Sequence, residues 1–72
     1  MMAPVPINNR IRELRAAHGE MSQLALAIKI GVTRQTVNAI ELGKYSPSLE
    51  VAFRIATVFN SPLEEVFQYQ KE

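Results

Sequence analysis

Apolar residues recur along most of this chain at the three- and four-residue spacing that places them on one face of a helix. The pattern predicts five short helices, separated by turns that contain Gly or Pro, over residues 8–17, 22–30, 34–42, 48–59 and 61–67. Their expected N-caps are Asn8, Ser22, Thr33, Ser48 and Ser61. No stretch alternates apolar and polar residues as a half-buried strand does. The pattern therefore predicts an all-α bundle.

The inner faces of these helices define the expected core. Its members are Ile7, Ile11, Leu14, Leu26, Ala27, Ile30, Val32, Val37, Ile40, Leu49, Ala52, Phe53, Ile55, Ala56, Phe59, Leu63, Val66 and Phe67. A chain of 72 residues forms one domain. We expect a flexible N-terminal arm at 1–6, the folded domain at 7–67 and a frayed tail at 68–72. Because the chain has no cysteine, the fold must rest on its apolar core alone or on a core completed by a partner chain.

Length and charge narrow the classes of function. No apolar run approaches the roughly 18 residues of a membrane span, and the start of the chain, MMAPVPI, lacks the features of a signal peptide. We therefore expect a cytoplasmic protein without a membrane partner. The net charge is only +1, but residues 1–48 carry six basic and three acidic residues, whereas residues 49–72 carry two and four. This asymmetry suits a protein with one face against phosphate.

The segment QLALAIKIGVTRQTVNAIEL, residues 23–42, is typical of two helices joined by a tight turn. Ala27 is small enough for the helices to approach closely, and Gly31 can leave the first helix through a left-handed conformation. Thr33 can cap the second helix. The outward row on that helix is polar or small, and it consists of Arg34, Gln35, Thr36, Asn38 and Ala39. A supported helix with such a row can read the major groove of DNA.

This segment resembles the helix-turn-helix of the Cro/C1-type family of DNA-binding domains. The first helix INNRIRELRAAHG, the run IELGKYSPSLEVAFRIATVF and the closing SPLEEVF are also similar to the family. The resemblance implies a five-helix, lambda-repressor-like fold and a transcriptional regulator, expected to be a repressor, whose partner is double-stranded DNA. It implies no cofactor, no metal and no small-molecule ligand.

The residues expected to touch DNA fall into two groups. Base contacts are expected from Arg34, Gln35, Thr36, Asn38 and Ala39. Arg can bond two acceptors of guanine, Gln can bond both edge groups of adenine, and Ala can touch a thymine methyl. Phosphate contacts are expected from Gln23, Thr33, Lys44, Tyr45 and Arg10. The alternative for each is an ordinary solvated or capping side chain.

Other polar residues have simpler interpretations. Glu41 is expected to bond Arg12 or Arg15, as the corresponding Glu in the family often bonds an arginine of the first helix. His18 is the sole histidine and has no second candidate ligand for a metal. No nucleophile–base set, carboxylate pair in one cleft or phosphate-cradling Gly loop is visible, so we do not expect an enzyme.

Two apolar sets suggest protein contacts. Leu63, Val66, Phe67 and Tyr69 are candidates for a homodimer surface, with core packing as the alternative. Leu24 and Ile28 lie four residues apart at positions that are usually polar in the family, and they suit a protein partner or a packed N-terminal arm through Val5. The second hypothesis is therefore a protein-interaction module, such as an antitoxin or anti-regulator, in which DNA binding is secondary.

Overall fold

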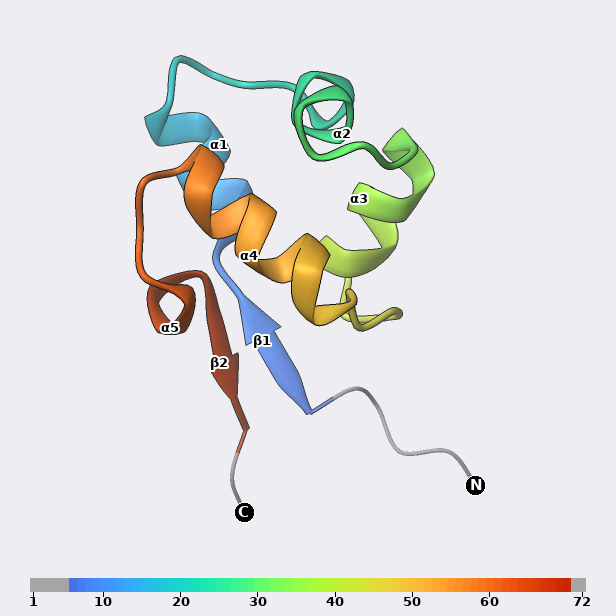
Figure 1. The fold of residues 1–72 in the computed structure, drawn as a ribbon, viewed down its shortest axis with the longest axis vertical. Helices are drawn as coiled ribbons and strands as arrows, with labels where there is room; N and C mark the ends of the chain where they lie inside the picture. The colour runs from blue at the N-terminus through green and yellow to red at the C-terminus, as the bar shows by residue number, and fades with distance from the viewer. Residues whose placement is uncertain (1–5, 71–72) are drawn as a thin grey trace.

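The computed structural model describes residues 6–70. Of the five helices, α4 (Leu49–Val58) crosses the centre of the molecule and the other four lie around it (Figure 1). The elements in chain order are β1 (Ile7–Asn9), α1 (Ile11–Ala17), α2 (Gln23–Ile30), α3 (Arg34–Glu41), α4 (Leu49–Val58), α5 (Leu63–Val66) and β2 (Phe67–Tyr69). The predicted mostly helical class and the count of five helices are confirmed within these residues.

The core draws on every helix and joins α2 and α3 to the rest of the molecule. The largest fully buried side chains are Ile11, Leu26, Ile30, Val37, Ile40, Ile55 and Val66. Leu49 and Phe53 were expected in this core, and that prediction is wrong: they are 68% and 51% exposed. They lie four residues apart on one side of α4, whereas Ile55 and Ala56 face the other helices.

Three of the predicted caps are confirmed. The hydroxyl of Ser22 accepts a hydrogen bond from the Ala25 amide at 2.9 Å, and that of Thr33 accepts one from the Thr36 amide at 3.1 Å. Ser48 does the same for α4. Ser61 is not a cap, because its hydroxyl donates to the Phe59 carbonyl at 3.1 Å. Instead, Pro62 occupies the N-cap position of α5.

The two ends of the described chain form a short antiparallel sheet, which we did not predict. Ile7 pairs with Tyr69, Asn8 with Gln68 and Asn9 with Phe67, and the sheet lies at the end of the molecule opposite α2 (Figure 1). The first helix therefore begins at Ile11 rather than at Asn8, and Asn8 is not its cap.

Asn9 explains why the helix starts late. Its side-chain amide donates to the Ile40 carbonyl at 3.0 Å, and its side-chain oxygen accepts from the Ile11 amide at 3.2 Å. At the other end, the tail expected to fray from Gln68 is instead a strand as far as Tyr69. Residues 1–5 of the expected arm and residues 71–72 of the expected tail lie outside the described residues.

Candidate nucleic-acid interface

The packing of α2 against α3 sets the geometry of the candidate interface. Ala27 is buried in the core, as predicted. Gly31 ends α2 with φ of 77°, in the left-handed region, and its amide donates to the Ala27 carbonyl at 2.9 Å. The reversal is therefore tight, and Thr33 starts α3 only two residues later.

The predicted outward row does lie on one side of α3. Val37 and Ile40 are buried against the rest of the molecule. Arg34 and Gln35 are exposed, and Thr36, Asn38 and Ala39 are half-buried. The row is thus a firmly supported surface of mixed hydrogen-bond donors and acceptors, with Ala39 as its small apolar member.

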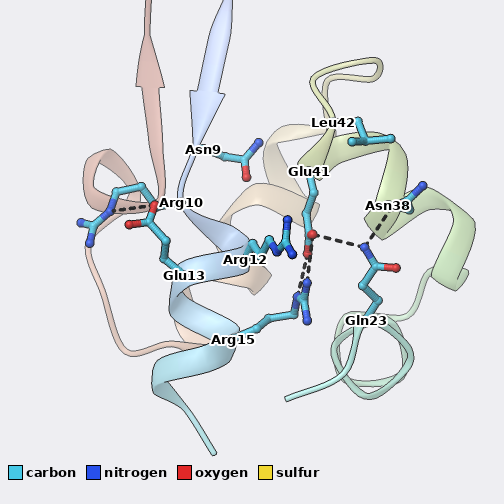
Figure 2. A pocket seen from close by; sticks show the side chains of 9 residues that line it. All are labelled: Asn9, Arg10, Arg12, Glu13, Arg15, Gln23, Asn38, Glu41 and Leu42. Carbon is cyan, nitrogen blue, oxygen red and sulfur yellow. Dashed lines mark hydrogen bonds and ion pairs between the residues drawn. The ribbon is translucent and has the colours of Figure 1, made fainter. Parts of the chain in front are cut away.

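A hydrogen-bonded network holds one flank of this row. The Gln23 amide nitrogen donates to the Asn38 side-chain oxygen at 3.0 Å and to a Glu41 carboxylate oxygen at 3.2 Å (Figure 2). The Gln23 oxygen accepts from the Arg34 guanidinium at 3.2 Å. Two expected base readers are therefore tied to an expected phosphate contact. Sequence spacing alone did not reveal this connection between α2 and α3.

Glu41 is also the anchor for α1. Arg15 donates to both oxygens of its carboxylate, at 2.7 and 3.0 Å, and to the Met21 carbonyl at 2.8 Å. The side chains of Arg15 and Glu41 are only 14% and 8% exposed. The expected bond between Glu41 and an arginine of the first helix is confirmed, and the arginine is Arg15 rather than Arg12.

The opposite flank of α3 meets the loop that follows it. Thr33, Gln35, Thr36, Ala39 and Tyr45 surround an open hollow of about 280 Å³. The Thr33 hydroxyl lies 2.9 Å from that of Thr36. Tyr45, which lines this hollow, and the preceding residue Lys44 are both exposed.

A larger cavity of about 350 Å³ lies between α1, the start of α2 and α3 (Figure 2). Arg10 and Arg12 line it together with Gln23, Asn38 and Glu41. Arg10, an expected phosphate contact, lies 3.8 Å from the Glu13 carboxylate. Arg12 was considered only as a partner for Glu41, so its place beside the candidate interface was missed.

The two apolar sets that were expected to contact proteins lie partly in the core and partly on the surface. Val66 is fully buried, so it belongs to the core and cannot be part of a dimer surface. Leu63 and Phe67 are half-buried, whereas Tyr69 is exposed. Leu24 and Ile28 are both exposed on α2, Ile28 by 72%. Val5, suggested as a contact for them, lies outside the described residues.

His18 has a structural environment. Its ring Nδ1 lies 2.9 Å from the Leu14 carbonyl, to which it donates as the Nδ1–H tautomer. The ring packs edge-on against Phe59 at 5.1 Å between centroids. The ring contact with Phe59 joins the end of α1 to the C-cap residue of α4.

Comparison with known proteins identifies the family of this chain. The helix-turn-helix family matches residues 11–66, and the chain belongs to it, as the resemblance to its Cro/C1 type implied. An uncharacterized HTH-type transcriptional regulator of Archaeoglobus fulgidus is 48% identical over 66 residues, which cover 92% of this chain and 93% of the relative.

Two further relatives give the same result. An uncharacterized HTH-type transcriptional regulator of Methanocaldococcus jannaschii is 46% identical, over 92% of this chain and 98% of its own. Another, YgzD of Bacillus subtilis, is 47% identical over the same shares. Family membership also confirms the prediction that the chain is not an enzyme. None of the helices within residues 6–70 is long and apolar enough to cross a membrane.

Proposed function

We propose that this protein is a sequence-specific, DNA-binding transcriptional repressor that places α3 in the major groove. The observation that carries the proposal is the outward row of α3, supported from behind by buried Val37 and Ile40. An α-helix fits the major groove of B-form DNA, which is about 12 Å wide. Base contacts come from Arg34, Gln35, Thr36, Asn38 and Ala39.

The groups that flank α3 set its register on the DNA. Phosphate contacts come from Gln23, Thr33, Lys44, Tyr45 and Arg10. Such contacts fix orientation without reading sequence. A bound domain blocks access to a promoter simply by occupying it, which supports repression as the outcome. Since the target is chromosomal DNA, the proposed location is the cytoplasm.

We further propose that two copies bind a palindrome, with half-sites about one DNA turn apart. The surface for the second copy is the sheet-side face, formed by Ile7, Leu49, Phe53, Leu63, Phe67 and Tyr69. Three cavities that share Leu63 connect these residues, and the sole charged residue that lines them is Glu64. Leu49, Phe53 and Tyr69 are 68%, 51% and 69% exposed, so the face leaves apolar surface for a second copy to cover.

The position of the sheet-side face supports a dimer on a palindrome. Pro47 lines its central cavity and follows Tyr45 of the DNA-facing flank by two residues. In the proposed dimer, the two-fold axis passes through this face in the direction that lets both α3 helices meet one DNA duplex.

The direct test is binding of the purified protein to its own upstream DNA and to a random duplex across a range of salt. The proposal predicts tighter binding to the upstream duplex, with affinity that falls steeply as salt rises. Equal, weak and salt-insensitive binding to both would contradict it.

The exposed pair Leu24 and Ile28 supports a second candidate, a protein-interaction module in which DNA binding is secondary. Co-purification of a partner that depends on these residues would favour it. The matched test replaces both with Ser: loss of the partner with DNA binding retained separates the two functions.

A further inference from the structure

The cavity between α1 and α3 has an uneven balance of charge. Three arginines and two glutamates line it. Each glutamate has an arginine partner, Arg15 for Glu41 and Arg10 for Glu13. The side chain of Arg12 is exposed and makes neither an ion pair nor a hydrogen bond with another of the residues 6–70. Figure 2 shows its side chain reaching from α1 into the cavity, toward Glu41 and Arg15.

The other polar groups named here already have partners within the protein. Asn9 uses its amide nitrogen and its oxygen in bonds to the Ile40 carbonyl and the Ile11 amide. Gln23 bonds Asn38, Glu41 and Arg34. Of the three arginines that line the cavity, Arg12 is thus the one whose side chain has no partner among residues 6–70 to give up. The ligand that suits a guanidinium best is a phosphate or a carboxylate.

The position of the cavity favours phosphate over carboxylate as the ligand of Arg12. A helix of about 10–12 Å diameter fills a major groove of about 12 Å, so a phosphate backbone must run along each flank of α3. On one flank, Tyr45 lines the smaller hollow, and Lys44 directly precedes it in the chain. On the other flank, Gln23, Asn38 and Leu42 form the side of the Arg12 cavity that faces α3.

We propose that Arg12 binds a phosphate of the DNA backbone that runs along this second flank, opposite the one held by Lys44 and Tyr45. The inference rests on the proposed function, because it requires α3 in the groove. It assigns Arg12 to docking rather than to base reading: the contact is to the backbone and is therefore independent of sequence.

The test is the salt dependence of binding to a short random-sequence duplex, measured by fluorescence anisotropy from about 50 mM to about 200 mM salt. Arg12→Gln should reduce the slope of log K against log salt by about 0.9, the contribution of one phosphate contact. Arg12→Lys should keep the wild-type slope, because it keeps the charge. Lys29→Gln, which removes a charge from the exposed last turn of α2, should also keep it.

Either of two results would overturn the Arg12 contact, and they differ in whether the proposed function survives. A steep wild-type slope that Arg12→Gln does not change rejects the Arg12 contact and leaves the proposed function intact. A wild-type protein that binds no duplex in a salt-dependent way rejects the proposed function and the Arg12 contact with it. Thermal unfolding of each variant verifies that it is folded.

Discussion

At the scale of single residues, Glu41 connects the three elements that form the candidate interface. It bonds Arg15 of α1 and Gln23 of α2 from its own position at the end of α3. An ion pair that is this buried is strongly destabilised when one partner is removed, because the other charge stays in a low-dielectric environment without compensation.

We therefore expect Glu41→Ala to lower the free energy of unfolding by about 3–5 kcal/mol. Urea denaturation followed by circular dichroism measures the change. The matched control is Glu50→Ala, which removes the exposed Glu50–Arg54 pair and should cost about 0.3–0.5 kcal/mol. Similar losses for the two variants would show that burial of the Arg15–Glu41 pair has no special role.

Ala27 is the smallest buried side chain of α2, and we expect it to set the distance between α2 and α3. A larger side chain at this position would push the two helices apart, so Ala27→Leu should destabilise the domain by about 1–3 kcal/mol and weaken DNA binding in the folded fraction. Ala16→Leu, at an exposed position of α1, is the control for a change in side-chain volume. Unchanged unfolding and binding for Ala27→Leu would mean that the helices are not held at this contact.

At the scale of elements, the helices could be predicted because their signals are local. Ser22, Thr33 and Ser48 each bond an amide three residues away, and Gly31 acts within its own turn. The strand pairing could not be predicted in this way. Each strand has three residues, too few for an alternating pattern, and the partners Ile7 and Tyr69 lie at opposite ends of the described chain.

The short sheet should add measurable stability. Truncation after Phe67 removes the pairing of Gln68 and Tyr69 with β1 and also the adjoining bond from the Gln70 amide to the Pro6 carbonyl. At about 0.5–1.5 kcal/mol for each net hydrogen bond, we expect a loss of about 1–3 kcal/mol in urea denaturation. Truncation after Gln70 is the control and should have little effect. An equal midpoint for the two truncations would mean that β2 does not stabilise the fold.

At the scale of the whole molecule, the candidate site was only partly predictable. The outward row of α3 follows from helical periodicity, since Val37 and Ile40 identify the opposite, buried side. The Gln23–Asn38–Glu41 network and the cavity beside Arg12 depend on how three helices meet, and no local pattern records that. Exposure of Leu49 and Phe53 was missed for a similar reason, because an apolar residue on a helix can face either a core or a second molecule.

The sheet-side face leads to a prediction about the monomer–dimer equilibrium. Leu49→Glu places a charge on that face and should shift the monomer–dimer equilibrium toward the monomer, by at least tenfold in dissociation constant, which is about 1.4 kcal/mol. Analytical ultracentrifugation with and without DNA measures the shift. Ile28→Glu, equally apolar and exposed but on α2, should leave assembly unchanged. The reverse pattern would place the contact between copies on α2.

The most direct test of the central claim is selection of binding sites from a pool of random duplexes, with wild-type protein and Gln35→Ala in parallel. If α3 reads bases, the wild type will enrich a palindromic sequence, and the variant will lose preference at one position of each half-site while keeping the others. A wild-type protein that enriches no sequence, or a variant whose preferred sequence is identical to that of the wild type, would contradict base reading by the outward row of α3.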